Sequence, residues 1–428
     1  MLTCRKSTFY ILIFFIVFAA QAASTAVSCS PHRCQLLDPC SKAEDCGSGL
    51  YCGNCPSAGK NQPTCTRAQT IQPTSVVEGL AFNKYSWLVT HNSFSNLNEP
   101  SHTGTQRLTF YNQEDSVTNQ LLNGVRGFML DMYDFEDDIW LCHSLQGHCY
   151  NFTAFEPAIN TLKEVGAFLA GNPSEIVTIF IEDYVHSFKG LTKLFTDAGL
   201  FKYWFPVSEM PSGSGDWPTV TTMVAKNHRL LVFTSIASKE ADEGIAYQWR
   251  YIVENESGDP GIVQGSCPNR KESQPLNSRT ASSLFLQNYF PTIPIQNEAC
   301  KEHSSGLVEM VGTCYKAAGR LPNFVAVNFY MRSNGGGVFD VQDKINGRTL
   351  CGCDTVTACQ PGKSRGDCKN VRAFNQTSPS SDLGGKGGIY SGYIEFNQKT
   401  SNALRLWFAY FLILNLFCPI LMLILILL

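Results

Sequence analysis

The cysteine pattern constrains this chain more than any other feature of its sequence. The chain has 428 residues and 18 cysteines, of which Cys4 and Cys418 lie in apolar segments near its two ends, leaving 16 between them. A dense and even set of cysteines is typical of disulfide-bonded proteins from oxidising compartments. Because seven is odd, at least one of the seven cysteines within residues 29–67 should pair outside this cysteine-rich module. The seven are Cys29, Cys34, Cys40, Cys46, Cys52, Cys55 and Cys65.

Both ends of the chain have the pattern of processing signals. Residues 1–23 combine a basic start, an uncharged apolar run and a small-x-small cleavage pattern, which predicts a signal peptide; an uncleaved N-terminal anchor is the alternative. The tail, residues 404–428, is apolar with no basic residue after it, and it follows a small and polar stretch, 375–403, that we interpret as a stalk with the attachment site. This layout predicts a glycosylphosphatidylinositol (GPI) anchor whose tail is removed, whereas a single membrane span is the alternative.

The remaining composition agrees with export. Asn151, Asn255 and Asn375 each begin an Asn-x-Ser/Thr sequon and are predicted glycosylation sites. The net charge is −3 and no basic tract is present, so we expect no nucleic-acid partner. The expected location is the extracellular face of the plasma membrane, reached through the secretory pathway and held in the outer leaflet by the lipid anchor.

Between residues 80 and 345 the pattern is α/β. Strand-like and helix-like runs alternate, which predicts a TIM-type (β/α)8-like barrel, irregular in detail, that follows the small disulfide-rich module. Four further cysteines within residues 346–372 predict a disulfide-stapled cap. The predicted strands are Tyr85–Thr90, Val125–Tyr133, Ile139–His143, Ile176–Tyr184, Arg229–Ser235, Leu284–Tyr289 and Phe324–Met331, and the predicted helices are Glu156–Ala170, Ser187–Ala198 and Leu307–Gly319.

Side chains that can carry chemistry lie at or near the ends of three predicted strands and of the short strand after the second. In a parallel barrel, such strand ends meet on the catalytic face. In chain order they are a His-Asn-Ser segment, a Gly-x-Arg-x₄-Asp segment, a histidine twelve residues later, and a strand ending in Glu: His91-Asn92-Ser93, Gly124-x-Arg126-x₄-Asp131, His143 and Glu182.

This order resembles the X domain of phosphatidylinositol-specific phospholipases C, most clearly over Tyr85–Tyr184. With its cysteine-rich, exported architecture, the whole chain resembles the plant-type, membrane-anchored members of that superfamily. The resemblance implies a phosphodiesterase acting on a membrane phospholipid or glycolipid at the cell surface. It also implies that His91 and His143 are the acid–base pair: the inositol 2-hydroxyl attacks the phosphorus, one group takes its proton, and another protonates the diacylglycerol oxygen.

Members of the superfamily balance the phosphate charge with Ca²⁺ or with an arginine. Asn92, Asp131 and Glu182 supply hard oxygen ligands and match three of the four protein ligands of the calcium-dependent members. Met129 stands where those members have Glu, and a thioether is a poor ligand for Ca²⁺. Strand alternation puts Arg126 on the face opposite Asp131, so these two should not share a site.

Two aromatic residues complete the candidate site. Tyr247 and Trp249 alternate with Tyr251, which predicts either the core of a strand or a surface that binds the substrate.

Two other functions remain open. A barrel that has lost activity through Met129 would be a cell-surface binding protein. A glycerophosphodiester phosphodiesterase would also use a barrel, a histidine and Ca²⁺, but its His-Arg-Gly and Glu-x-Thr signatures are not found at these strand ends.

Overall fold

The computed structural model describes residues 29–144, 147–211, 213–278, 280 and 282–369. The predicted signal peptide, stalk and hydrophobic tail, and the sequon at Asn375, lie outside these residues. Within the described residues, no helix is both long enough and apolar enough to cross a bilayer.

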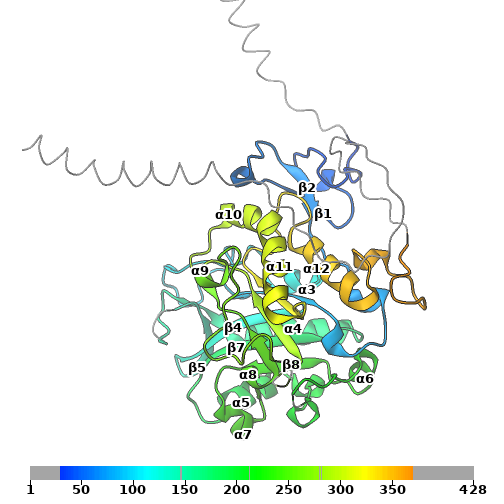
Figure 1. The fold of residues 1–428 in the computed structure, drawn as a ribbon. Coiled ribbons are helices and arrows are strands. Elements are labelled where there is room, and N and C mark those ends of the chain that lie inside the picture. Colours follow the sequence, from blue (N-terminus) through cyan, green and yellow to red (C-terminus); the bar gives the residue numbers. More distant parts are fainter. Residues whose placement is uncertain (1–28, 145–146, 212, 279, 281, 370–428) are drawn as a thin grey trace, which may run out of the picture. The chain divides into compact units, whose positions relative to one another are not determined.

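Eight parallel strands form a curled sheet at the centre of the protein (Figure 1). In the described part of the chain, β9 and β10 do not pair with each other, so the sheet does not close into a complete barrel. The one-turn helix α8 (Gln248–Tyr251) joins these two strands. The prediction of an irregular α/β barrel is therefore confirmed. In spatial order the strands are β10 (Ile252–Glu254), β11 (Leu284–Asn288), β12 (Phe324–Val327), β3 (Trp87–Thr90), β4 (Gly127–Phe135), β7 (Val177–Tyr184), β8 (Leu230–Thr234) and β9 (Ala246–Tyr247).

Helices follow most of the strands, and an antiparallel hairpin, β5 (Asp138–Cys142) and β6 (Ala154–Pro157), extends from β4. All seven predicted strands and all three predicted helices overlap an observed element. The larger helices are α4 (Ala158–Gly171), α5 (Gly190–Asp197), α11 (Leu307–Ala318) and α12 (Gly337–Asn346). The shorter ones are α2 (Pro73–Val76), α3 (Val117–Leu122), α6 (Val220–Ala225), α7 (Ser238–Glu243), α9 (Gly258–Gly261), α10 (Gln296–Lys301), η3 (Phe82–Lys84), η4 (Phe201–Tyr203), η5 (Val207–Glu209), η6 (Glu302–Gly306), η7 (Gly347–Cys351) and η8 (Val356–Ala358).

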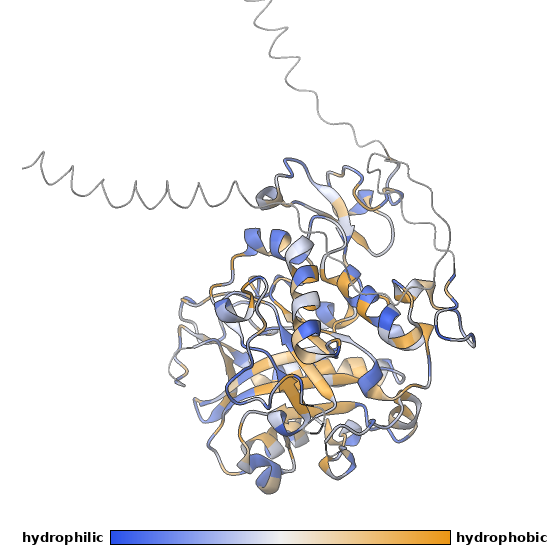
Figure 2. Cartoon of the chain, viewed as in Figure 1, coloured by the Kyte–Doolittle hydropathy of each residue, from blue (hydrophilic) through white to orange (hydrophobic). Residues whose placement is uncertain are grey.

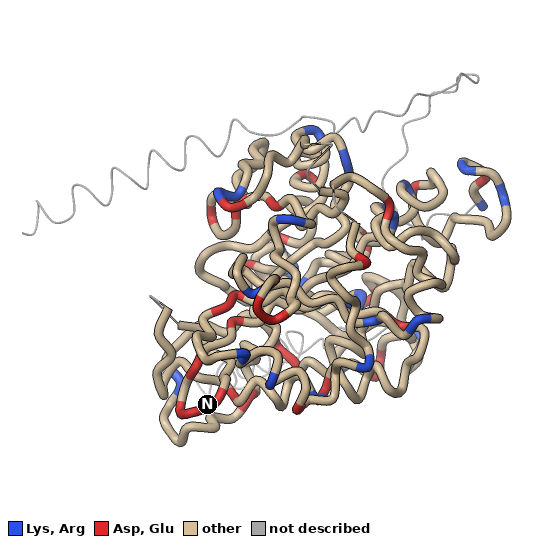
Figure 3. Tube along the Cα trace, turned by 90° about the horizontal axis from the view of Figure 1, so that it is seen from below, with Lys and Arg blue, Asp and Glu red and all other residues tan. Residues whose placement is uncertain are grey.

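Strand alternation divides the hydrophobic core into two parts. Trp87, Val89 and Phe180 pack inside the barrel, whereas Leu88 and Ile179 pack outward against the helices. Successive side chains of a strand point to opposite faces, so each strand contributes to both layers. Figure 2 shows the central strands as predominantly hydrophobic, while the surrounding helices and loops are mixed. Acidic and basic residues are interspersed along the described trace (Figure 3).

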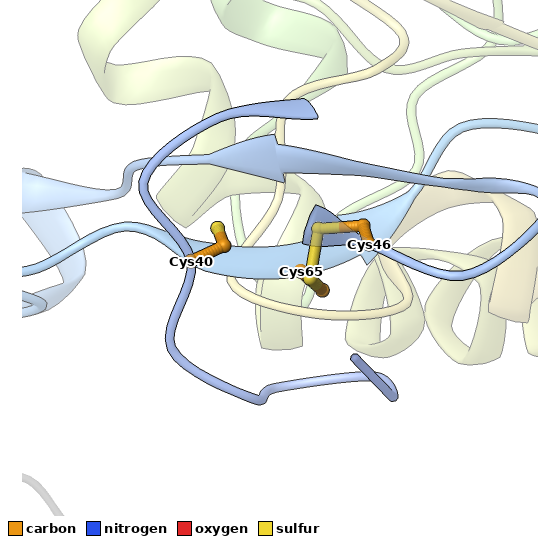
Figure 4. Close-up of side chains that lie close together, drawn as sticks. All are labelled: Cys40, Cys46 and Cys65. Carbon is orange, nitrogen blue, oxygen red and sulfur yellow. A yellow bond between two sulfur atoms is a disulfide. The ribbon is translucent and has the colours of Figure 1, made fainter. Parts of the chain in front are cut away.

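The cysteine-rich module folds around η1 (Ala43–Asp45), β1 (Leu50–Gly53), η2 (Pro56–Ala58) and β2 (Thr64–Arg67). Cys40, Cys46 and Cys65 lie close together (Figure 4), but Cys46 pairs with Cys65 and Cys40 pairs with Cys52. Their sulfur atoms are therefore committed to disulfides and are not thiolate ligands for a metal.

The module is fixed to the barrel by a crosslink, as the odd cysteine count predicts. Cys55 pairs with Cys300, a separation of 245 residues. The Arg67 guanidinium lies 2.6 Å from Asp343 and 2.9 Å from Asp340, both on α12.

The predicted cap is stapled by two disulfides, and the other three pairs of the described chain are local or within the barrel. These five pairs are Cys351–Cys359, Cys353–Cys368, Cys29–Cys34, Cys142–Cys149 and Cys267–Cys314.

Candidate active site

A cavity of about 280 Å³ opens on the side of the barrel where the parallel strands end. It brings together residues that are far apart in the sequence but follow or end neighbouring strands, as expected for a barrel of this type. The predicted site residues that line it are His91, Asn92, Asp131, Glu182 and Trp249.

His91 follows β3 directly, and its ring stacks on Phe290, with ring centroids 3.7 Å apart and planes 5° apart. Its Nδ1 lies 2.9 Å from Asn328 Oδ1, which also accepts a hydrogen bond from Asn112. The Asn112 amide nitrogen, a donor, also lies 3.3 Å from Nδ1, but the Asn328 oxygen is nearer and can only accept, so we assign the proton to Nδ1, which leaves Nε2 as the acceptor. Burial lowers the pKa of His91 to about 3, so the ring is neutral at physiological pH.

His143 follows β5, and it is held in the same way by a different partner. Its Nδ1 lies 3.0 Å from the carbonyl oxygen of Phe110, an obligate acceptor, so Nδ1 again carries the proton. Burial lowers the pKa of His143, while the charge of Glu182 acts in the opposite direction. His143 is not part of the cavity lining, but its charge also lowers the pKa of His91. His143 therefore lies close enough to His91 to affect its protonation.

Asp131 and Glu182 are direct neighbours in the parallel ladder of β4 and β7. Asp131 is buried, and burial together with the nearby Glu182 charge raises its pKa well above its usual value. The Asn92 side-chain oxygen is buried and has no hydrogen-bond partner among the described residues. Two adjacent carboxylates and an unpaired amide oxygen are a suitable set of ligands for a hard cation such as Ca²⁺.

Met129 lines the cavity together with these ligands. The position that holds Glu in the calcium-dependent members therefore faces the site here with a thioether in place of a carboxylate. The nearby acidic turn does not replace the missing carboxylate. Asp134 accepts backbone hydrogen bonds from His186 and Ser187, and together with Asp137 it lines a different cavity.

Sequence reasoning missed Arg270, which lies in the loop between β10 and β11 and also lines the cavity. Its Nη1 lies 3.4 Å from the Glu254 carboxylate, its Nε lies 3.1 Å from Glu272, and its guanidinium lies over the Trp249 ring. No local motif surrounds Arg270, so only the fold reveals that a cation lies here. Glu254 and Asn328 were missed for the same reason.

The aromatic residues after β9 do not form a strand core. Residues 248–251 turn into α8, so the alternating pattern reflects one helical turn. Trp249 lines the cavity and donates its indole N–H to Glu254 at 2.7 Å. Tyr247 packs edge-on against Trp249 but is not part of the lining.

Arg126 lies away from the cavity, as strand alternation predicts. Its Nε lies 2.8 Å from Glu175, and its Nη1 donates to the carbonyl groups of Leu121 and Val125. The Gly-x-Arg part of the motif therefore stabilises the amino-terminal end of β4, while Asp131 belongs to the site.

The glycosylation prediction requires one correction. Asn151 is exposed and remains a predicted site. Asn255 is completely buried, and its amide donates to the carbonyl groups of Glu256 and Asn288 and accepts from the Asn288 N–H. A glycan on its nitrogen would break these bonds inside the barrel, so the prediction of a glycan at Asn255 is wrong.

Comparisons with known proteins find one family model and several similar chains. The PI-PLC X family model ("PI-PLC X 1") matches residues 86–346. A PI-PLC X domain-containing protein of Arabidopsis thaliana is 62% identical over 406 residues, which is 94% of each chain. An uncharacterized secreted protein of Arthroderma benhamiae is 27% identical over 270 residues, covering 58% of this chain and 59% of its own. Among solved structures, the phosphatidylinositol-specific phospholipase C from Listeria monocytogenes matches with a TM-score of 0.39 and 18% identity, over 59% of this chain and 90% of that chain.

Proposed function

The chain belongs to the PI-PLC X-domain family, whose model covers more than half of it, and on this basis we propose that it cleaves an inositol phospholipid or a related phosphodiester by His/His acid–base catalysis. The observation that carries this proposal is the pair of fixed imidazoles. His91 and His143 each use Nδ1 in a hydrogen bond to a fixed acceptor, which leaves both Nε2 atoms free at the same end of the barrel. Two such groups suit a reaction in which one proton is taken up and another is delivered.

The residues of the cavity divide the remaining tasks. Asn328 and Phe290 hold the His91 ring in one orientation and one tautomer. Asn92, Asp131 and Glu182 would hold Ca²⁺, which would stabilise negative charge on the phosphate oxygens. Arg270 is the cation that the cavity lining itself supplies, so an arginine-based stabilisation of phosphate is the alternative.

A lipid surface as the partner is supported by the distribution of exposed apolar residues. Of the 14 large hydrophobic residues that are exposed in the described chain, seven lie on loops that directly follow a parallel strand, and Val263 lies farther along the connection after β10, beyond α9. Exposed apolar residues that gather on one side of a protein mark a surface that binds another protein or a membrane. This apolar rim consists of Leu97, Leu108, Phe110, Phe188, Ile236, Val263, Ile293 and Ile295.

The test of the function uses the purified protein without its predicted signal peptide and tail. It is incubated with phosphatidylinositol vesicles and, separately, with a GPI-linked protein, each with Ca²⁺ and with excess chelator. We expect release of diacylglycerol from at least one of these substrates, with the inositol phosphate either free or still attached to the released protein. Absence of any phosphodiester cleavage would favour the alternative function, a cell-surface binding protein that retains the barrel.

We propose further that the protein acts at the outer cell surface, held by a GPI anchor. Treatment of expressing cells with a bacterial phosphatidylinositol-cleaving enzyme should release it into the medium. Mature protein that still contains Leu406–Leu428, detected by mass spectrometry, would contradict the anchor.

A further inference from the structure

The loop between β3 and α3 carries groups that orient both candidate catalytic histidines. The Phe110 carbonyl lies 3.0 Å from His143 Nδ1 and fixes that ring. The Asn112 amide donates to Asn328 Oδ1 at 3.0 Å, and the same oxygen lies 2.9 Å from His91 Nδ1. The position of this one loop therefore affects both imidazoles.

Glu114 follows Asn112 by two positions, and its carboxylate is held by two other elements. Arg332, on the segment after β12, donates through Nε to Oε2 at 2.7 Å and through Nη2 to Oε1. Gln296, the first residue of α10, donates to Oε1 at 2.7 Å. An arginine–carboxylate pair with two parallel bonds fixes geometry as well as charge.

The cysteine-rich module supports both elements that hold Glu114. Tyr51, in β1, donates its hydroxyl to the carbonyl of Met331 at 2.6 Å, directly before Arg332. The disulfide between the module and the barrel joins α10, the other element. Contacts therefore run from the module through Arg332 and α10 to Glu114, and from there along the loop to the partners of the two histidines.

This inference rests on the proposed function and deepens it: we propose that Glu114 is a positioning residue, which holds the loop so that both imidazoles keep their reactive orientation. Glu114 is not among the described residues that line the cavity, so it acts through Phe110 and Asn112. A displacement of about 1 Å can cost on the order of a hundredfold in rate. The ion pair itself is partly exposed, 23% for Glu114 and 24% for Arg332, so its loss should cost little stability.

The first test compares kcat and KM on phosphatidylinositol vesicles for the wild type, Glu114→Gln and Arg332→Lys. The glutamine keeps the shape of the side chain without its charge, and the lysine keeps the charge without the fork of donors. We expect kcat to fall roughly tenfold to a hundredfold in both variants. KM and the unfolding temperature should stay close to the wild-type values, because the loss concerns reactive geometry.

Glu209→Gln is the matched control. Glu209 lies in η5, is 33% exposed and is held by Lys226 through both of its oxygens. Its loss removes a comparable ion pair before β8 and should leave kcat unchanged. Wild-type kcat in both Glu114→Gln and Arg332→Lys, or an equal loss in the control, would overturn the inference.

Tyr51→Phe tests the contribution of the module. This variant removes the hydroxyl that binds the Met331 carbonyl and keeps the ring, so it should fold and lose kcat severalfold. An unchanged kcat would contradict the support that we assign to the module.

Nitrogen-15 NMR of the histidine rings tests the inference without turnover. If the wild type cleaves no lipid, the proposed function is rejected, but the orientation of the rings is still measurable. We expect the Nδ1–H tautomer for His91 and His143 in the wild type, and a mixture of tautomers for both rings in Glu114→Gln. The exposed His186 should give the same signal in both proteins. Unchanged signals from His91 and His143 would overturn the inference.

Discussion

Single residues determine the protonation chemistry of the candidate site. Asn328 and the Phe110 carbonyl each fix one histidine through Nδ1, and each hydrogen bond raises the pKa of its ring by less than burial lowers it. Burial then keeps both rings neutral. The sequence motif predicts which two histidines take part, but it does not predict their partners. Asn328 is 237 positions from His91, and the partner of His143 is the backbone carbonyl of Phe110.

The first prediction concerns these two histidines. His91→Ala and His143→Ala should each reduce turnover on phosphatidylinositol by roughly a hundredfold to ten-thousandfold, the usual contribution of a general acid or base. The double variant should lose much less than the product of the two single effects, because both groups serve one reaction. Turnover and circular dichroism spectra measured on the same preparations separate catalysis from folding.

His186→Ala is the matched control. His186 is exposed on the loop after β7, so its removal should leave turnover nearly unchanged. Near-full activity of either His91→Ala or His143→Ala would reject the assignment of the pair.

A second residue-scale prediction concerns Glu302, at the start of η6. Burial raises its pKa from 4.5 to about 7, and the charges of Glu298 and Asp259 act in the same direction. Because the folded protein holds this proton more tightly than the unfolded chain, stability should fall as the pH rises from about 4.5 to about 7. Glu302→Gln should remove this loss, which is on the order of 1–2 kcal/mol after allowance for solvent screening.

Thermal unfolding at pH 4, 6 and 8 measures this effect. The variant should unfold at a higher temperature than the wild type at pH 8 and at nearly the same temperature at pH 4. Parallel pH profiles for the two proteins would show that Glu302 does not titrate as inferred.

At the scale of elements, the register of β4 and β7 places two carboxylates side by side. Replacing Asp131 by Asn should change the unfolding temperature relative to the wild type in opposite directions without and with a bound cation. In excess chelator, Asp131→Asn should raise the unfolding temperature because the repulsion between Asp131 and Glu182 is lost. In millimolar Ca²⁺, the wild type should be stabilised and Asp131→Asn much less so, because a ligand that binds more weakly stabilises the folded state less at the same concentration.

Asp137→Asn is the control for this experiment, since Asp137 lies in the turn after β4 and outside the cavity. It should keep the full stabilisation by Ca²⁺. If Asp131→Asn retains it too, the carboxylates do not hold the cation. Full turnover of the wild type in chelator would favour Arg270 as the group that balances the phosphate charge.

The elements also show what the sequence can and cannot predict. Long strands such as β4 and β7 have a clear apolar run or alternation, and their predicted positions are correct within a few residues. β9 and β10 have two and three residues, too few for any periodicity, so both were missed. The helical turn between them, α8, is too short to be told from a strand by its sequence pattern. The sequence therefore does not predict that this turn brings Trp249 to the cavity.

At the scale of the whole molecule, the apolar rim should determine binding to membranes. Leu108 is 68% exposed on the loop after β3, and Leu122 is 64% exposed at the end of α3, just before the amino-terminal end of β4. Burying a leucine in an apolar environment contributes roughly 1.5–3 kcal/mol. Leu108→Ser should therefore weaken cosedimentation with phosphatidylinositol vesicles severalfold or more, while Leu122→Ser should not.

Phe188→Ser provides an independent test, because Phe188 is 91% exposed on another loop of the rim. Both rim variants should leave cleavage of a soluble substrate such as glycerophosphoinositol esters much less affected than cleavage of vesicles. Equal losses on soluble and vesicle substrates would place these residues in the catalytic machinery and not in membrane docking.

The crosslink between the module and the barrel has a consequence for biosynthesis. Cys55 emerges during synthesis long before its partner, because 245 residues separate it from Cys300. At translation rates of about 5–20 residues per second, Cys55 must remain unpaired for roughly 10–50 s, while the other cysteines of the module are already available. The nascent chain therefore passes through a period in which a premature bond with a neighbour competes with the correct one, and its yield should depend on an enzyme that reshuffles disulfides.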